Sequence, residues 1–500
     1  MDLFRILYKK EVKPDLHYFF LVGAVFIFIL LRIPSLFEPD WYGDEAIYQI
    51  MGRAVLHGRV LYKGIWDNKP PILYLYYALV DGDLFLIKLL SLIFGVGAVI
   101  IFYILAKTLF QKSNFSVILS TTFFTVLFGL PLLEGNIANA ENFMLFPTLL
   151  SLYILLHVTS KSKKILPIYA GLLLSLSFLT KIVAVFDLTA FLTIVFFLRY
   201  FDLNLKDTLK KILNLQQLFS DFKYIFIFIL SFCIPIFLIL LFFLIAGALP
   251  DFMRATFSQN IGYVNYGNSF IIPQGFLIIK ILLLLAGIIG TQFIKKKLGP
   301  SGVIVYIWFL FSVFSSFFSG RPYTHYMLLA LPAVSLLLGY IFHKGKLAFF
   351  HAIIFLIVIL LFWFNFNFYK KIVPYYKNYY DYVFSKKSTD DFQSFFDRST
   401  PRNYDIARFI NMNTQKDDEI LVVSNSAQIY YLSNKLPPGR YIVAYHIDFY
   451  PNAVAETKNA IEDKKPKFII STDKSVVQNF LRGYNHKYSI QDVQVYEKIY

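Results

Sequence analysis

The segment between residues 37 and 83 combines acidic side chains with a lysine in a pattern that could support group transfer. Asp44 and Glu45 directly follow Trp41-Tyr-Gly, and Lys69 directly precedes two prolines. A carboxylate can deprotonate an attacking hydroxyl, and a lysine can bind a phosphate group. Long connections without apolar runs are usually functional. We therefore expect chemistry in this segment rather than a solvated connector.

Three further polar clusters interrupt apolar stretches. Glu141 opens one stretch, Lys181 separates two others, and Arg321, His325 and Tyr326 precede a later one. Each has a structural alternative, because Glu141 could be a favourable charge at a helix N-terminus and Lys181 could snorkel. His325 alone could be structural. An ionisable group near membrane depth is nevertheless a functional candidate, and arginine suits bidentate phosphate recognition.

Weaker candidates have no such clustering. Lys88 and Lys280 lie near the ends of apolar stretches, where both can snorkel to the surface. The remaining weak candidates are Asp187, Arg254, Gln259 and Asn260.

Composition shows which elements must position these residues. Hydrophobic residues make up 57% of the 500-residue chain and charged residues 16%, with a mean hydropathy of +0.57. A membrane-spanning helix needs about 20 mostly apolar residues. Eleven stretches qualify, and we expect a polytopic α-helical membrane protein with a retained first span. They lie near 16–36, 84–106, 114–132, 142–159, 165–180, 182–200, 223–248, 274–294, 300–318, 322–342 and 347–369.

The distribution of basic residues predicts the orientation. Connections assigned to the inside hold 19 lysines and arginines, whereas those assigned to the outside hold 7. Because positive charge accumulates on the cytoplasmic side, the N-terminus is expected inside and the C-terminus outside. Most of the net charge of +16 is then a topology signal and does not indicate nucleic acid. The single cysteine, Cys233, excludes an intrachain disulfide and a cysteine-based metal site.

The chain becomes more polar beyond residue 370. Strand-like segments alternate with helix-like ones, which predicts a small α/β domain with a largely parallel sheet. We therefore expect a membrane domain over 1–369 and an extracytoplasmic domain over 370–500, without a dinucleotide-binding motif. The expected strands are 419–423, 441–444, 467–471 and 491–499, and the expected helices are 403–413, 452–463 and 474–482.

A helix is also expected over 44–57 within the first external loop. Its apolar residues recur on one stripe, which predicts a helix lying on the membrane surface. The stripe consists of Ile47, Ile50, Met51, Ala54 and Val55.

These motifs resemble the protein O-mannosyltransferase/aminoarabinose transferase family, glycosyltransferase family 39, over residues 16–345. The most specific match is the first loop, with Trp41-Tyr-Gly-Asp44-Glu45, Tyr48, Gly52-Arg53, Gly58, Leu61-Tyr62 and Trp66-Asp-Asn-Lys69-Pro-Pro71. Supporting matches are Asn139-Ala-Glu141, Phe178-Leu-Thr-Lys181 and Gly320-Arg321-Pro-Tyr-Thr-His325-Tyr326 with Pro332. Ile182 departs from the glycine usual in aminoarabinose-type enzymes, and the tail lacks the repeats of eukaryotic protein mannosyltransferases.

The resemblance implies a GT-C fold and a membrane glycosyltransferase that moves a sugar from a polyprenyl-phosphate donor to a protein, lipid or glycan acceptor on the outer face. By position, Asp44 would be the general base, with Glu45 and Glu141 as further acidic residues of the site. Lys69, Arg321 and Lys181 would bind the donor phosphate. Residues expected to contact substrate are Tyr48, Arg53, Tyr62, Asn68, His325 and Tyr326.

No metal or other cofactor is required by these residues, although Glu141 or His325 could ligate a divalent metal. A single displacement assisted by one carboxylate predicts inversion at the anomeric carbon. The alternatives are an oligosaccharide ligase or polymerase, a lipid-linked sugar transporter or flippase, and an inactive scaffolding relative. Transporters usually place polar sites near the membrane middle, whereas the clusters in this chain lie at one face. A prokaryotic plasma or inner membrane is the expected location.

Overall fold

A computed structural model describes residues 14–111, 113–158, 165–214, 222–260, 275–343, 348–450, 452–472 and 474–499. Parts of the basic inside connections, and 261–273 of the external loop 249–273, lie outside these ranges. The chain forms two compact units. The bundle unit comprises Met1–Ile33, Leu90–Leu241 and Asn260–Ile372, and the loop unit comprises Pro34–Leu89, Phe242–Gln259 and Val373–Tyr500.

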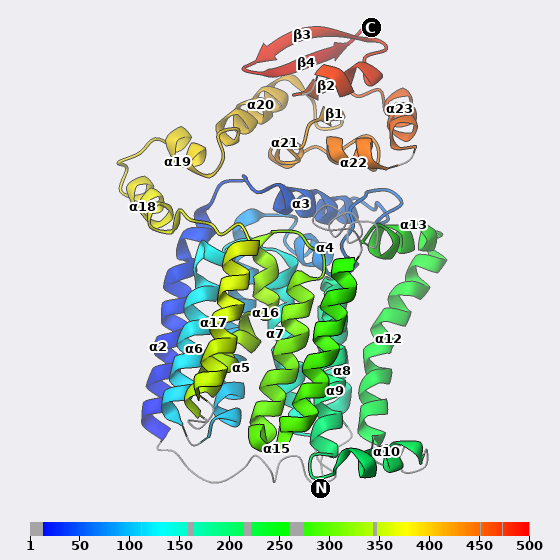
Figure 1. Ribbon diagram of the computed structural model, residues 1–500. Coiled ribbons are helices and arrows are strands. Elements are labelled where there is room, and N and C mark those ends of the chain that lie inside the picture. The colour runs from blue at the N-terminus through cyan, green and yellow to red at the C-terminus, as the bar shows by residue number, and fades with distance from the viewer. Residues whose placement is uncertain are drawn as a thin grey trace. The chain divides into compact units, whose positions relative to one another are not determined.

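Long apolar helices form the bundle unit (Figure 1). Seven helices in the described part of the chain are long and apolar enough to cross a membrane, and α6, α7 and α8 are shorter apolar helices. The chain is therefore a multi-span membrane protein. The apolar helices are α2 (Pro14–Arg32), α5 (Leu84–Leu109), α6 (Asn114–Gly129), α7 (Ala140–Leu156), α8 (Ile165–Thr180), α9 (Val185–Arg199), α12 (Lys223–Ile245), α15 (Gly275–Phe317), α16 (Met327–His343) and α17 (Ala348–Asn365).

Helix α15 consists of two arms that meet at Gly299 and Pro300. Gly299 has φ 72° and ψ 173°, a conformation that favours glycine, and Pro300 has no backbone N–H to continue the helix. The hydroxyl of Tyr340 donates a hydrogen bond to the Leu298 carbonyl at 2.6 Å, which satisfies an acceptor that the break exposes. The two arms correspond to the predicted spans 274–294 and 300–318, so each predicted span is helical in the described residues.

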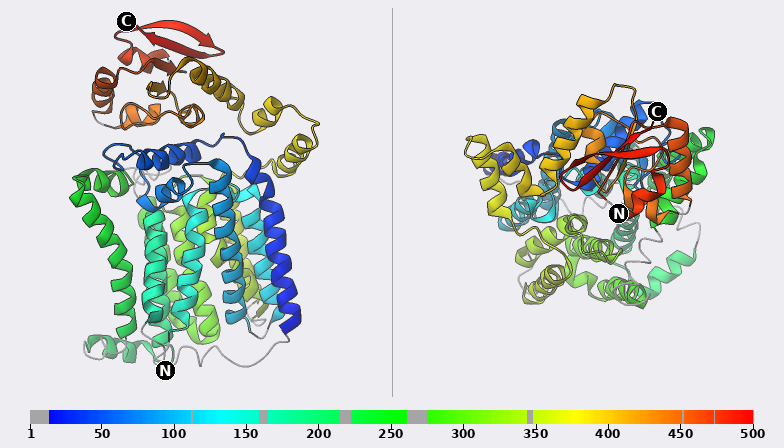
Figure 2. Two further views of the ribbon diagram at one scale, coloured as in Figure 1. Left: turned by 180° about the vertical axis from the view of Figure 1, so that it is seen from behind. Right: turned by 90° about the horizontal axis from the view of Figure 1, so that it is seen from above.

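Helix α16 lies at the centre of the bundle and packs against α6, α7, α15 and α17. In the apolar segment Thr324–His343, which contains α16, 83% of the residues in the most apolar part are buried, compared with 17% in α12 and in α17. Helix α6 also packs against α2, and Figures 1 and 2 both show these two helices side by side. A Cβ atom on Gly339 would lie 2.8 Å from the Ser116 carbonyl oxygen, so glycine permits the close approach of α16 to α6.

The loop unit combines the first external loop with a small sheet domain. Its strands are β1 (Ile420–Val423), β2 (Phe468–Ser471), β3 (Tyr484–Ile490) and β4 (Val493–Lys498). Its helices are α3 (Gly43–Leu56), α4 (Pro71–Ala78), α13 (Leu249–Met253), α18 (Ile372–Val383), α19 (Thr389–Phe396), α20 (Thr400–Asn413), α21 (Gln428–Leu432), α22 (Ala444–Phe449), α23 (Ala453–Lys464) and α24 (Lys474–Val477).

The sheet has the order β1-β2-β4-β3 and only one parallel pair, β1 with β2. The prediction of a largely parallel sheet is therefore wrong, because β4 pairs antiparallel with both β2 and β3. Strand β3 escaped detection because it is mostly exposed and reads as a polar sequence. The predicted strand 441–444 is also wrong. This segment is buried but forms no ladder and runs into α22, so its apolar side chains indicate packing rather than pairing.

Helix α3 confirms the helix predicted over 44–57, but the expectation that its apolar stripe faces a membrane surface is wrong for four of the five stripe residues. Ile47, Ile50, Met51 and Ala54 are each at most 3% exposed, and α3 packs against α4 and α21. A Cβ atom on Gly52 would lie 2.7 Å from the Ala78 backbone nitrogen. Because glycine has no side chain, the backbones of α3 and α4 can approach each other closely at this position. The apolar stripe of α3 is thus part of a protein core.

The C-terminal residues belong to the same compact unit as the first external loop. Gln428 Nε2 donates a hydrogen bond to the Trp41 carbonyl oxygen at 2.9 Å, and the Tyr404 hydroxyl accepts one from the Asp40 backbone nitrogen at 3.1 Å. An independently folding domain over 370–500 stays a prediction.

Candidate active site

Asp44 and Lys69 of the loop unit both contact Tyr48. Helix α3 begins at Gly43, so Asp44 occupies its first turn and Tyr48 follows one turn later on the same face. The Tyr48 hydroxyl lies 3.4 Å from Asp44 Oδ2, and Lys69 Nζ lies 5.8 Å from the centre of the Tyr48 ring. Asp44 is half-buried, whereas Tyr48 is only 2% exposed. A buried aromatic ring therefore connects the predicted base with a predicted phosphate ligand.

Two tyrosine hydroxyls fix the backbone of Lys69. Tyr74 accepts a hydrogen bond from the Lys69 nitrogen at 2.9 Å, and Tyr62 donates one to the Lys69 carbonyl at 2.8 Å. Tyr74 in turn donates to Asp67 Oδ2 at 2.7 Å. Burial raises the pKa of both Tyr62 and Tyr74 well above the ordinary value, so both hydroxyls keep their protons. Asn68 accepts from Lys69 Nζ at 2.7 Å. In the structure, Tyr62 and Asn68 thus hold Lys69.

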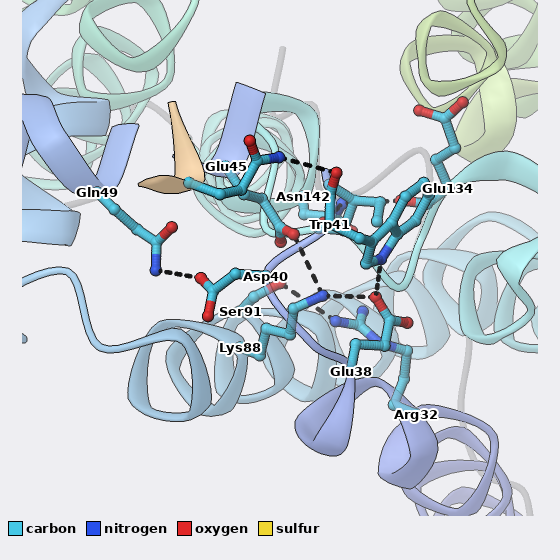
Figure 3. A network of polar contacts seen from close by, with 12 residues as sticks. Arg32, Glu38, Asp40, Trp41, Glu45, Gln49, Lys88, Ser91, Glu134 and Asn142 are labelled. Atoms are coloured by element: carbon cyan, nitrogen blue, oxygen red, sulfur yellow. Dashed lines mark hydrogen bonds and ion pairs between the residues drawn. The ribbon is translucent and has the colours of Figure 1, made fainter. Parts of the chain in front are cut away.

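Glu45 points into a buried ion-pair network rather than beside Asp44. Lys88 Nζ lies 2.8 Å from Glu38 Oε2 and 3.3 Å from Glu45 Oε2, and all three side chains are at most 3% exposed (Figure 3). The Tyr375 hydroxyl donates to the other oxygen of Glu38 at 2.6 Å. The prediction that Lys88 snorkels is wrong, because its ammonium group is fully buried between two carboxylates. Sequence reasoning missed Lys88 and Glu38 as partners because their pairing spans 50 residues of chain.

Arg53 and Asp40 attach the first loop to the C-terminal residues. The Arg53 guanidinium lies 4.3 Å from the centre of the Tyr431 ring and 3.5 Å from Asp81 Oδ1. Asp40 accepts a hydrogen bond from Gln49 Nε2 at 2.9 Å (Figure 3). Burial raises the pKa of Asp40, and the bond from Gln49 opposes this effect. Arg53, predicted to contact substrate, holds parts of the loop unit together in the structure.

The bundle unit holds a second cluster of predicted site residues. Lys181 Nζ forms a buried ion pair with Glu141 and lies 4.5 Å from the centre of the Tyr326 ring. His325 Nε2 lies 3.7 Å from the same carboxylate. The snorkelling alternative for Lys181 is not supported, because its side chain is 11% exposed and paired. The structure thus brings together residues from three segments that are far apart in sequence: Glu141, Lys181 and the pair His325 and Tyr326.

Glu134 is a member of this cluster that sequence reasoning did not single out. Its Oε2 atom lies 2.7 Å from His325 Nδ1. Its backbone has φ 57° and ψ 29°, the left-handed region that non-glycine residues rarely adopt. Asn142 stabilises this turn by donating to the Ile137 carbonyl at 2.5 Å. The sequence does contain a signal for Glu134: this acidic residue lies between the turn-forming Pro131 and Gly135, just before the helix predicted to follow.

The other predicted residues have separate partners. Arg321 is half-buried, and its backbone nitrogen donates to Ser319 Oγ at 3.3 Å. Asp187 accepts a hydrogen bond from Trp308 Nε1 at 2.9 Å, and Lys280 Nζ donates to the Phe317 carbonyl at 2.6 Å. Arg254 begins a short π-helical segment, Arg254–Ser258. Within the described ranges, no group of three His, Cys, Asp or Glu side chains is arranged to hold a metal ion.

Comparison with known proteins supports the resemblance on two levels. Residues 64–249 match the family described as dolichyl-phosphate-mannose-protein mannosyltransferase. This match begins inside the first external loop and includes Lys69, Glu141 and Lys181. No curated protein matches the chain in sequence.

Solved structures match the fold over nearly the whole chain. ArnT from Cupriavidus metallidurans bound to undecaprenyl phosphate aligns with a TM-score of 0.53 at 12% identity, over 97% of this chain and 98% of that one. Its apo state gives 0.51 at 12% identity, over 96% and 97%. The apo oligosaccharyltransferase of Archaeoglobus fulgidus gives 0.48 at 13% identity, over 92% and 70%. The chain is a multi-span membrane protein that shares the fold of ArnT, and its residues 64–249 match the dolichyl-phosphate-mannose-protein mannosyltransferase family.

Proposed function

We propose that this protein transfers a sugar from a polyprenyl-phosphate donor to an acceptor on the outer membrane face. The observation that carries the proposal is the contact of Tyr48 with both Asp44 and Lys69. It places a half-buried carboxylate and an ammonium group on one aromatic side chain, which suits a base and a phosphate ligand. The family match and the fold shared with ArnT, which was crystallised with undecaprenyl phosphate, support this assignment.

In the proposed reaction, Asp44 accepts the proton of an acceptor hydroxyl while the hydroxyl oxygen attacks the anomeric carbon. The bond from that carbon to the donor phosphate breaks, and the phosphate leaves with the electron pair. Lys69 stabilises the charge that develops on the phosphate. General-base assistance typically contributes about 10²–10⁴-fold, and electrostatic stabilisation is often the largest effect. A single displacement predicts inversion of the anomeric configuration, and a product with retained configuration would contradict this mechanism.

Residues of the bundle unit receive supporting roles in the proposal. Lys181 and Arg321 are further candidate phosphate ligands, and Tyr326 stacks beneath the Lys181 ammonium group. Glu141 neutralises Lys181 and lies near His325, so its carboxylate sets the charge of this cluster. Glu45 is proposed to support Asp44 indirectly, because its ion pair with Lys88 anchors the first turn of α3.

The orientation with the N-terminus inside and the C-terminal residues outside remains part of the proposal, as does a prokaryotic plasma or inner membrane. Protein, lipid and glycan acceptors are all compatible with an attacking hydroxyl. The site residues do not favour one sugar.

The decisive experiment is mass spectrometry of lipid-linked sugars after deletion of the gene. A transferase predicts accumulation of one polyprenyl-phosphate sugar together with loss of that sugar from an acceptor. Wild-type protein should reverse both changes, whereas the Asp44→Asn variant should reverse neither. A transporter would instead trap the donor on the inner leaflet, and a ligase would cause accumulation of an oligosaccharide on its lipid. Unchanged lipid-linked sugars would overturn the proposal.

A further inference from the structure

The turn that carries Lys69 is held by the C-terminal segment 440–450. The Trp66 backbone nitrogen donates a hydrogen bond to the Arg440 carbonyl at 2.9 Å. The Trp66 ring, which is 1% exposed, has the Arg440 guanidinium 5.0 Å from its centre and the Tyr450 ring 5.3 Å away, edge on. Backbone and side chain of this tryptophan are therefore both fixed by the same segment.

Arg440 is itself anchored by two carboxylates. Its Nε and Nη2 atoms form a bidentate pair with Glu456, at 2.7 and 2.8 Å. Its Nη1 atom lies 2.9 Å from Asp251 Oδ1 and 3.4 Å from the Tyr62 carbonyl. Because bidentate pairing restricts a guanidinium strongly, Arg440 is a rigid support for Trp66. Its charge is also balanced within the protein by Asp251 and Glu456.

A second route leads from the same segment to Lys69. His446 Nε2 lies 3.8 Å from Asp67 Oδ1, and both side chains are at most 5% exposed. The other Asp67 oxygen accepts a hydrogen bond from the Tyr74 hydroxyl, and this hydroxyl accepts one from the Lys69 backbone nitrogen. Displacing Asp67 would therefore move Tyr74 and, with it, the backbone of Lys69, and His446 packs on Asp67 at a distance too long for a hydrogen bond.

We propose that the C-terminal segment positions Lys69 for the donor phosphate, with Arg440 and His446 as positioning residues. The inference rests on the proposed function, in which Lys69 binds that phosphate. In this proposal the C-terminal residues act on the reaction by positioning Lys69, and they do not contact the substrate themselves. A small displacement of a phosphate ligand weakens an interaction that depends on short distances, because Coulomb attraction and hydrogen bonding both fall with separation.

Binding of undecaprenyl phosphate to the full-length protein in detergent tests the inference, with undecaprenol as the probe that lacks phosphate. Arg440→Gln should weaken undecaprenyl phosphate binding about ten- to a hundredfold, a size typical of misplaced site groups. Binding of undecaprenol should not change. Arg402→Gln is the matched control, because Arg402 pairs with Asp492 in the same C-terminal region at 2.7 Å, and the contacts that the structure describes for the Arg402 side chain are with Asp492 and Asn403.

The double variant Lys69→Ala with Arg440→Gln separates positioning from general damage. If Arg440 acts through Lys69, the double variant should bind no more weakly than Lys69→Ala alone. If Lys69→Ala weakens binding but Arg440→Gln does not, the positioning role is wrong and the proposed function stands. If Lys69→Ala binds as wild type does, the assigned role of Lys69 is wrong. Should Arg440→Gln lower the melting temperature, His446→Asn provides the same comparison through the Asp67 route, and unchanged binding there would overturn the inference.

Discussion

Lys69 Nζ lies 5.8 Å from the centre of the Tyr48 ring, the same ring whose hydroxyl approaches Asp44. An ammonium group above a ring that is largely removed from water is held by a cation–π interaction. The Tyr48 side chain thus links the predicted base, Asp44, with the predicted phosphate ligand, Lys69, within the loop unit.

Asp44→Asn should abolish sugar transfer while the protein remains as stable as wild type. The side chain is half-buried and its contact with Tyr48 is a long one, so an amide can replace the carboxylate without loss of packing. Transfer assays in membranes, together with a melting curve, provide the measurement. Asp83→Asn is the matched control, since the Asp83 side chain accepts a hydrogen bond from the Leu86 backbone N–H at 2.8 Å and an asparagine can do the same. Activity of Asp44→Asn within tenfold of wild type would show that Asp44 is not the base.

Lys88→Met should destabilise the protein by about 3–5 kcal/mol, the cost of leaving buried carboxylates without their counter-charge. Glu38 and Glu45 would remain buried at a site where Lys88 provides the positive charge. The triple variant that adds Glu38→Gln and Glu45→Gln should recover much of this loss, because no uncompensated charge remains. Melting temperatures of the two variants in detergent give the comparison. If Lys88→Met melts as wild type does, the buried network does not exist as described.

The spans were predictable because lipid requires continuous apolar helices, and each predicted stretch contains a helix or a helical arm in the residues that the structure describes. Helix α3 was predictable as a helix but not in its environment. Amphipathic periodicity shows that one face avoids water, yet it does not distinguish lipid from protein. The edge strand β3 was not predictable, since an exposed strand has no apolar alternation to detect.

The site was predictable in its residue types but not in its pairings. The motifs identified Asp44, Lys69 and Lys181 because each stands next to a distinctive neighbour in sequence. The partner of Lys88 and the role of Glu134 depend on contacts between distant segments, which a single sequence does not encode locally. Tyr62 and Arg53 matched the motif, but their buried contacts indicate that they support the loop.

Glu134→Ala and Glu134→Gly should separate the backbone role of Glu134 from its contact with His325. Both variants lose the hydrogen bond to His325, but glycine also removes the strain of a positive φ, which costs about 1 kcal/mol for other residues. Glu134→Gly should therefore melt higher than Glu134→Ala, while sugar transfer should fall to a similar extent in both. Melting curves and transfer assays measure the two effects. Full activity in Glu134→Gly would show that the carboxylate has no part in the reaction.

The stability of the loop unit should fall as the pH drops from about 6.5 to 4, because His446 is held neutral. Burial, assisted by the nearby Lys69 charge and opposed by Asp67, lowers the pKa of His446 to about 4. Between the two values the unfolded chain binds the additional proton, so stability rises with pH in this window and is lost as pH falls. His446 should contribute about 2 kcal/mol to the loss between pH 7 and pH 5. His446→Gln should therefore show a smaller drop in melting temperature over this range, whereas the exposed His486→Gln control should match wild type. An equal drop in all three proteins would mean that His446 is not buried in its neutral form.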